Sequence, residues 1–284
     1  MASDIIFSKY HALGNDYIII NPDDIPLNGL DADEVKRICH RNFGVGSDGI
    51  LLGPLDSSEG DFRLQIYNPD GSEAEKSGNG LRIFSRYLWD KDLVQEMPFT
   101  ILTDGGLVKS QILENGRSVR VDMGKVNFFS DRIPVRGPKR EVINEKITIN
   151  NEDFIFNAAT IGNPHCVVVC DKLDPERIKE LGPVIENHDI FPNRTNVQFM
   201  RIVDRQNIQI EIWERGAGYT LASGSSSSAS AAVAKRLGHC DSDINVHMPG
   251  GVINISISDD FFITMTGSVT KVSVGQLSNE IFDN

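Results

Sequence analysis

The chain of 284 residues has only four cysteines, and none of them form a Cys-x-x-Cys pair. Cysteines scattered in this way are typical of reduced thiols, so we expect no disulfides. The six histidines show no His-x-His or His-Glu-x-x-His spacing, which gives no support for a metal site. We therefore expect no metal site.

Positive charge and long apolar runs are also scarce. Lysine and arginine number 28 against 40 acidic residues, which gives a net charge of -12. This balance argues against a nucleic-acid partner, which would require a basic face for the phosphates. The first residues lack the pattern of a signal peptide, and no apolar run approaches membrane-spanning length. The sequence predicts a cytoplasmic protein with no membrane partner.

The sequence does contain an internal repeat, in which four features recur in the same order. Their offsets are 163 − 15 = 148, 214 − 68 = 146, 223 − 77 = 146 and 250 − 105 = 145. The matching pairs are Leu13-Gly14-Asn15 with Ile161-Gly162-Asn163, Asn68 with Glu214, Ser77-Gly78 with Ser223-Gly224, and Gly105-Gly106 with Gly250-Gly251. Four ordered pairs indicate a duplicated architecture.

Each repeat is predicted to be an α+β lobe with one helix near its start and another after the Ser-Gly pair. The early helices are indicated by Asp33-Glu34 and by Asp174 before Pro175. We place the N-terminal lobe at residues 1–125, completed by a C-terminal strand at 272–284. The C-terminal lobe then covers residues 126–271.

The helices after the Ser-Gly pairs differ in composition. Leu81, Phe84 and Leu88 recur at helical spacing in the first, whereas the second, which ends before Gly238, consists largely of alanine and serine. Small residues let strands approach a helix closely, which suits a helix enclosed by a curved, barrel-like sheet. The alternative for the second segment is a flexible serine linker.

Paired Ser-Gly turns predict anion sites, because a glycine turn that opens a helix exposes backbone N–H groups at the positive end of the dipole. One such turn would be explained equally well by an ordinary helix start. Two at equivalent positions could hold a substrate carboxylate while one group removes an α-proton and its twin returns one. Asn15, Asn68, Asn163 and Asn196 are candidates for binding an amino acid, although a turn or capping role would explain each alone.

Five motifs together resemble the diaminopimelate epimerase family, and the resemblance covers essentially the whole chain. These motifs are Lys9-Tyr10-His11-Ala12-Leu13-Gly14-Asn15-Asp16, Gly44-Val45-Gly46-Ser47-Asp48-Gly49, Asn68-Pro69-Asp70-Gly71-Ser72-Glu73, Gly162-Asn163-Pro164-His165-Cys166 and Trp213-Glu214-Arg215-Gly216-Ala217-Gly218. The resemblance implies two pseudo-symmetric lobes, each a curved sheet around a central helix. It also implies cofactor-independent interconversion of LL- and meso-diaminopimelate, and a homodimer.

The resemblance further implies a set of site residues. His165 and Glu214 would support proton transfer, and Ser77 and Ser223 occupy the positions of the acid–base pair. The residues implied to bind the substrate are Asn15, Asn68, Gly78, Asn79, Asn163, Asn196, Glu214, Arg215, Gly224 and Ser225.

The sequence departs from the family at the acid–base pair itself, where the family has two cysteines. A serine hydroxyl is far less acidic than a thiol and needs a neighbouring base. Lys76, His165, Glu214 and Tyr219 are the candidates for that base. The serines could be an engineered change or the mark of a natural branch; the atypical Lys76 and the serine at position 226 favour a natural branch.

Three hypotheses follow from the sequence. The first is an amino-acid epimerase with diaminopimelate as the expected substrate. The second is a divergent isomerase or lyase for another carboxylic acid. The third is a catalytically dead form that only binds its ligand.

Overall fold

The computed structural model describes residues 5–25 and 29–282 and divides into two compact units. The first unit comprises residues 1–122 and 267–284, and the second comprises residues 123–266. The sequence-based boundaries fell at 125/126 and 271/272, three and five residues further along. The differences arise within strands β7 (Ser118–Lys125) and β16 (Phe262–Ser268), each of which contains a division point.

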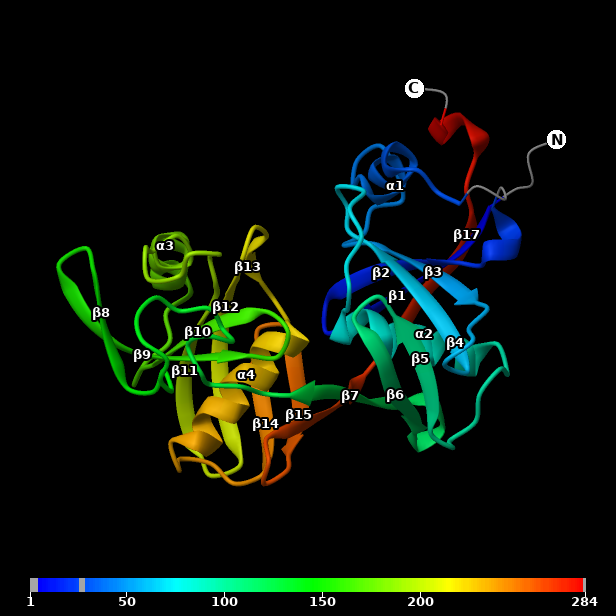
Figure 1. Ribbon diagram of the computed structural model, residues 1–284. Helices are drawn as coiled ribbons and strands as arrows, with labels where there is room; N and C mark the ends of the chain where they lie inside the picture. The colour runs from blue at the N-terminus through cyan, green and yellow to red at the C-terminus, as the bar shows by residue number, and fades with distance from the viewer. Residues whose placement is uncertain (1–4, 26–28, 283–284) are drawn as a thin grey trace. The chain divides into compact units, whose positions relative to one another are not determined.

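The first unit is a sheet around one helix, α2 (Gly78–Asp90), with α1 (Ala32–Cys39) outside it (Figure 1). Helix α2 packs against β1, β2, β3 and β6. The strands of this unit are β1 (Ile6–Ala12), β2 (Asn15–Ile20), β3 (Ile50–Leu55), β4 (Phe62–Tyr67), β5 (Phe99–Thr103), β6 (Gly106–Leu113), β7 and β17 (Thr270–Gln276). Strand β17 pairs antiparallel with β1, but it ends at Gln276, earlier than the strand predicted at 272–284, and a 3-10 helix follows at Asn279–Phe282.

The second unit is built in the same way around α4 (Gly224–Arg236), with α3 (Pro175–Glu186) outside. Helix α4 packs against β9 to β12 and against β14 and β15. Its strands are β8 (Glu145–Ile149), β9 (Glu152–Thr160), β10 (Pro164–Val169), β11 (Asn196–Asp204), β12 (Asn207–Glu214), β13 (Gly218–Thr220), β14 (Asp243–Met248), β15 (Gly251–Ile257) and β16.

The strand pairings repeat from one unit to the other. Strand β2 runs parallel to β3, and β10 runs parallel to β11. Antiparallel β3–β4 and parallel β4–β5 correspond to antiparallel β11–β12 and parallel β12–β14. The hairpin β5–β6 corresponds to β14–β15. The duplication read from the sequence therefore describes the topology of both sheets.

Helix α4 is buried along nearly its whole length, so the alternative of a flexible serine linker is wrong. Serine can occupy a buried helix when its hydroxyl bonds to the carbonyl one turn back. Ser227 Oγ donates to Ser223 O at 2.8 Å, and Ser228 Oγ donates to Gly224 O at 2.8 Å. Small side chains satisfied in this way allow six strands to pack around the helix.

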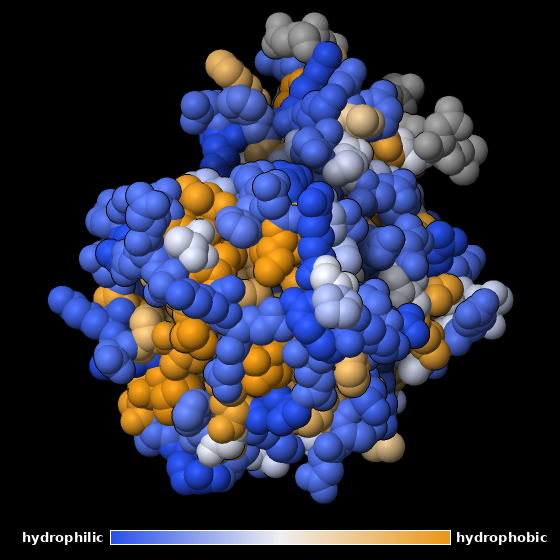
Figure 2. Space-filling model, turned by 60° about the vertical axis from the view of Figure 1, so that its left-hand side comes forward, coloured by the Kyte–Doolittle hydropathy of each residue, from blue (hydrophilic) through white to orange (hydrophobic). Residues whose placement is uncertain are grey.

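Two predicted helix boundaries are confirmed, and α1 begins at Ala32 with Asp31 as its N-cap, just before the predicted Asp33-Glu34. Helix α3 begins at Pro175 with Asp174 as its N-cap, and α4 ends just before Gly238, whose φ of 78° is accessible to glycine without strain. All four cysteines are free thiols, as expected. None of the helices in the described part of the chain is long and apolar enough to cross a membrane. The face shown in Figure 2 carries apolar patches that are separated by hydrophilic side chains.

Candidate active site

The two Ser-Gly pairs adopt the same local structure. Ser77 (φ -135°, ψ 117°) and Ser223 (φ -146°, ψ 124°) are extended N-cap residues of α2 and α4. Ser77 Oγ accepts from Gly80 N at 3.0 Å, and Ser223 Oγ accepts from Ser226 N at 3.4 Å. Gly78 and Gly224 are the first residues of the two helices. Each unit thus presents a helix N-terminus with a hydroxyl beside it, which is a favourable site for an anion. We call these two helix starts, at Ser77-Gly78 and Ser223-Gly224, the half-sites.

In the first unit, a chain of hydrogen bonds orients two of the predicted asparagines. Asn79 Nδ2 donates to Asn15 Oδ1 at 2.9 Å, and Asn15 Nδ2 donates to Asp48 Oδ2 at 2.8 Å. Asp48 is in turn paired with Arg41 at 2.6 Å, and Arg41 also contacts Asp16 at 2.8 Å. Asn15 therefore lies next to the start of α2 with a fixed amide orientation.

Arg82 supplies positive charge below the same helix start and was missed by the sequence analysis. It is fully buried, and its Nη2 donates to Asn79 Oδ1 at 2.5 Å while its Nη1 donates to Ser268 O at 3.3 Å. Burial lowers the pKa of Arg82 to about 10, so the guanidinium stays charged at neutral pH. A cation here adds to the helix dipole and favours an anion at the N-terminus of α2.

Asn68 lies at the end of β4 and forms the predicted turn. Its backbone N–H donates to Ser72 O at 2.8 Å, and its Nδ2 donates to Ser72 Oγ at 3.0 Å. Gly71 closes the turn by donating its N–H to Asn68 O at 3.0 Å. These bonds give Asn68 a turn role, and none of them joins it to Asn15 or Asn79.

In the second unit, four predicted residues lie in one hydrogen-bonded group. His165 Nε2 is 2.9 Å from Asn163 Oδ1, Asn163 Nδ2 donates to Ser225 Oγ at 3.4 Å, and Ser225 Oγ is 3.5 Å from Ser223 Oγ. Because an amide oxygen can only accept, His165 Nε2 carries the proton in this contact. His165 therefore orients Asn163 and bonds to its amide oxygen.

Burial in the second unit sets the charge of His165. The side chain is fully buried, and loss of solvation lowers its pKa from 6.5 to about 3; contact with Gln198 opposes this shift, and the charge of Arg215 adds to it. His165 is therefore neutral at physiological pH. A neutral imidazole that donates to Asn163 acts as a positioning group for the half-site.

This shift predicts a specific dependence of stability on pH. Because the folded-state pKa of about 3 lies below the ordinary 6.5, the contribution of neutral His165 is complete above pH 6.5 and is lost as the pH falls toward 3. The slope of unfolding free energy against pH in this range should fall in a His165→Gln variant by at most about 1.4 kcal/mol per pH unit. Urea unfolding between pH 7 and pH 4 measures it. The exposed His239→Gln is the matched control, and equal slopes in wild type and His165→Gln would refute the prediction.

A second group in the same unit holds the turn that carries Glu214 and Arg215. Asn196 Oδ1 accepts from Arg215 N at 3.0 Å, and Asn196 Nδ2 donates to Pro164 O at 2.8 Å. Glu186 accepts from Trp213 Nε1 at 2.7 Å and from Gly216 N at 3.0 Å. Glu186 thus fixes the two ends of the segment 213–216, and Asn196 fixes Arg215 between them. Glu186 was not identified from the sequence, because a glutamate in a surface helix looks ordinary.

The bonds found at the two serine hydroxyls come from backbone amides and other hydroxyls. Tyr219 Oη donates to Glu211 at 2.6 Å, and burial together with that carboxylate raises the pKa of Tyr219 to about 12. Lys76 Nζ donates to Asp122 O at 3.4 Å, and burial lowers its pKa. The bonds described for these two candidate bases are thus to Glu211 and to Asp122.

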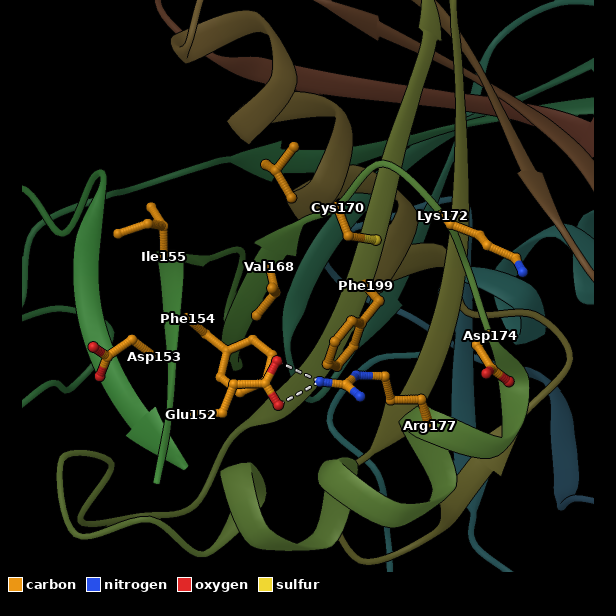
Figure 3. A pocket seen from close by; sticks show the side chains of 11 residues that line it. Glu152, Asp153, Phe154, Ile155, Val168, Cys170, Lys172, Asp174, Arg177 and Phe199 are labelled. Atoms are coloured by element: carbon orange, nitrogen blue, oxygen red, sulfur yellow. Dashed lines mark hydrogen bonds and ion pairs between the residues drawn. The ribbon is translucent and has the colours of Figure 1, made fainter. Parts of the chain in front are cut away.

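A pocket of about 310 Å³ in the second unit contains none of the predicted site residues (Figure 3). It lies among β9, β10, β11 and the start of α3, and both oxygens of Glu152 are 2.5 Å from Arg177 Nη2. Arg177 is thus already neutralised by a carboxylate. Lys172 also lines this pocket, but none of the residues predicted to bind substrate does, so we base the functional assignment on the two helix starts. No cluster of three or more potential metal ligands occurs in the described ranges.

Comparison with known proteins gives the family. The family model for diaminopimelate epimerase matches residues 7–129 and 157–272. Diaminopimelate epimerase 2 of Nostoc sp. is 64% identical over 276 residues, which are 97% of this chain and 96% of that protein. Diaminopimelate epimerase of Caldanaerobacter subterraneus is 38% identical over 275 residues, which are 95% of this chain and 98% of that protein.

Solved structures with low sequence identity share the fold. A probable proline racemase from Agrobacterium radiobacter has a TM-score of 0.72 at 15% identity, covering 98% of this chain and 94% of its own. A hydroxyproline epimerase from Agrobacterium vitis has a TM-score of 0.70 at 16% identity, covering 98% and 92%. The fold class predicted from the sequence, α+β with two lobes that each enclose a helix, is confirmed. Since the family model matches both repeats and the relatives align along nearly the whole chain, this protein belongs to the diaminopimelate epimerase family.

Proposed function

We propose that this protein is an isomerase that converts LL-diaminopimelate to meso-diaminopimelate by exchanging the α-proton, without a cofactor. The observation that carries this proposal is the pair of matching helix starts, each with a serine hydroxyl beside the backbone N–H groups of the first turn and an oriented asparagine. The 64% identical relative named diaminopimelate epimerase 2 supports the choice of substrate.

In this proposal the helix N-termini bind the reacting amino acid. Backbone N–H groups at Gly78 and Gly224 and their neighbours stabilise the carboxylate as negative charge builds up on it during proton removal. Asn15, Asn79, Asn163 and Ser225 fix the polar groups of the substrate, and Arg82 strengthens the first anion site. Asn68, Asn196, Glu214 and Arg215 are proposed to bind the remainder of the substrate.

Ser77 and Ser223 are the proposed acid–base groups, one from each unit. His165 acts indirectly by fixing Asn163. Glu214 is retained as a proton-transfer residue on the strength of the family resemblance. The serine pair gives a slower reaction than a thiol pair would, because a hydroxyl releases its proton less readily.

A second candidate function is ligand binding without turnover. The observation that favours it is that the hydrogen bonds found at Ser77 Oγ and Ser223 Oγ come from Gly80 N, Ser226 N and hydroxyl groups, which are not strong bases. Such a protein would hold a carboxylate at its helix N-termini with no exchange.

Chiral chromatography of the products separates the two functions. Incubation of the unaltered chain with LL-diaminopimelate should yield the meso isomer, and a panel of other amino acids should remain unchanged. Calorimetric binding of LL-diaminopimelate with no isomer formed would favour the second candidate. Conversion of a different carboxylic acid with no change to diaminopimelate would favour a divergent isomerase or lyase.

The family resemblance also supports two further proposals: that the protein is a homodimer, and that it acts in biosynthesis in the cytoplasm. Light scattering at several concentrations tests the dimer, because a mass that stays at 31.4 kDa would overturn it.

A further inference from the structure

Among the described residues, Ser77 Oγ has a tyrosine hydroxyl as a neighbour, and no such neighbour is found at Ser223 Oγ. Tyr17 Oη is 3.2 Å from Ser77 Oγ. The bonds described for Ser223 Oγ are instead to Ser226 N at 3.4 Å and to Ser225 Oγ at 3.5 Å. The two half-sites therefore differ at the atom that would transfer the proton.

Tyr17 is held firmly in this position. It lies in β2, between β1 and β3, and its side chain is only 7% exposed. Its ring fills the space beside Gly49, where a Cβ atom would lie 2.7 Å from Tyr17 Cε1 and 2.4 Å from Tyr67 O. Gly49 thus makes room for the ring, which brings the phenol to Ser77.

The hydrogen-bonding capacity of Ser77 makes this contact useful. A serine oxygen can accept two hydrogen bonds and donate one. Gly80 N–H already donates to Ser77 Oγ, so a donated bond from Tyr17 would leave the serine proton free to point toward a substrate. Both donors would also stabilise negative charge on that oxygen.

We propose that Tyr17 is a positioning residue that makes Ser77 competent as the acid–base group of the first unit. The inference deepens the proposed function and rests on it. When a substrate carbanion is protonated, Ser77 gives its proton to the α-carbon and Tyr17 gives its proton to Ser77 Oγ. Two O–H bonds break, while one C–H bond and one O–H bond form. The resulting phenolate regains a proton from water, and the reverse sequence removes the α-proton.

A phenol suits this task better than a second serine does. A free phenol has a pKa of about 10, far closer to neutrality than an aliphatic hydroxyl. The cost of moving a proton through Ser77 is therefore reduced. A thiol at position 77 would need no such help, since its own pKa is about 8.5.

This difference between serine and thiol provides the test. Four proteins are compared by the rate of α-proton exchange in diaminopimelate: the unaltered chain, Tyr17→Phe, Ser77→Cys, and Tyr17→Phe/Ser77→Cys. We expect Tyr17→Phe to lower kcat about 10²-fold with serine at position 77 and less than about 3-fold with cysteine there. A merely structural role for Tyr17 would give equal losses in both backgrounds and would overturn the inference.

A matched control is available in the adjacent strand. Tyr10 is fully buried, pairs with Tyr17 across β1 and β2, and donates its hydroxyl to Asp90 at 2.8 Å. Tyr10→Phe removes the same atom from the same sheet, away from Ser77. It should change the rate by the same factor in both backgrounds.

A second measurement decides the inference even if no substrate reacts. In Ser77→Cys, a hydrogen bond from Tyr17 should stabilise the new thiolate, so adding Tyr17→Phe should raise the pKa of the new thiol. Thiolate absorbance can follow this titration, because burial raises the pKa of all four native thiols. If Tyr17→Phe leaves the pKa of the thiol at position 77 unchanged, the contact between Tyr17 and Ser77 is refuted. If that pKa rises but no variant exchanges the α-proton, only the proposed function is refuted.

Discussion

Replacing both Ser77 and Ser223 with cysteine is expected to raise kcat for α-proton exchange in diaminopimelate about 10³-fold. The physical reason is acidity: a thiol with a pKa of about 8.5 is partly ionised at neutral pH, and a helix N-terminus lowers that value further. Both serines already occupy helix N-caps of the same geometry, so the sulfur atoms would start at equivalent positions. Exchange into the α-position in heavy water measures the rate.

Two controls separate acid–base chemistry from other effects of new thiols. Ser58→Cys/Ser242→Cys introduces two cysteines at exposed positions and should leave the rate unchanged. Ser77→Ala/Ser223→Ala keeps the helices but removes both hydroxyls and should abolish exchange. A cysteine pair that is no faster than the serine pair would contradict the acid–base role of positions 77 and 223.

Glu186→Ala is expected to lower the free energy of unfolding by about 3 kcal/mol, because it removes a buried carboxylate that accepts three hydrogen bonds worth about 1 kcal/mol each. The Glu186 side chain accepts from Trp213 Nε1, from Gly216 N and from Arg194 Nη1, the last at 3.0 Å. Its loss should also release the segment that carries Glu214 and Arg215. We therefore expect KM for diaminopimelate to rise along with the loss of stability, and urea unfolding and steady-state kinetics measure the two effects.

Glu180→Ala is the matched control, since Glu180 is an exposed residue of the same helix α3. It should change the free energy of unfolding by less than about 0.5 kcal/mol. If Glu186→Ala behaves like Glu180→Ala, the hydrogen bonds at Glu186 do not hold the turn in solution.

The sequence was sufficient to predict the fold because the repeat constrains it. The turns at Gly14 and Gly162 can be predicted from the residue type alone, because both glycines adopt a positive φ, 89° and 109°, that other residues rarely adopt. The N-caps Ser77 and Ser223 are likewise visible as Ser-Gly pairs before helical patterns. Local chemistry of this kind determines element boundaries and does not depend on distant contacts.

The sequence was insufficient where a side chain acts through a distant partner. Tyr17 reads as one more apolar residue of a buried strand, yet its hydroxyl meets Ser77, 60 residues away in the chain. Arg82 reads as part of a helix surface, yet it is fully buried. His165 was expected to take part in proton transfer, a role that remains a prediction, but burial makes it neutral and directs its proton to Asn163. Burial and pairing across strands decide these roles, and neither is visible in local sequence.

The central claim is that this chain exchanges an α-proton with both of its serines intact. Proton NMR of LL-diaminopimelate incubated with the unaltered protein in heavy water measures this directly. We predict that the α-proton signal decays as deuterium enters and that meso-diaminopimelate accumulates, with both changes absent in Ser77→Ala and in Ser223→Ala. An undiminished α-proton signal at high enzyme concentration, with substrate bound, would contradict the account.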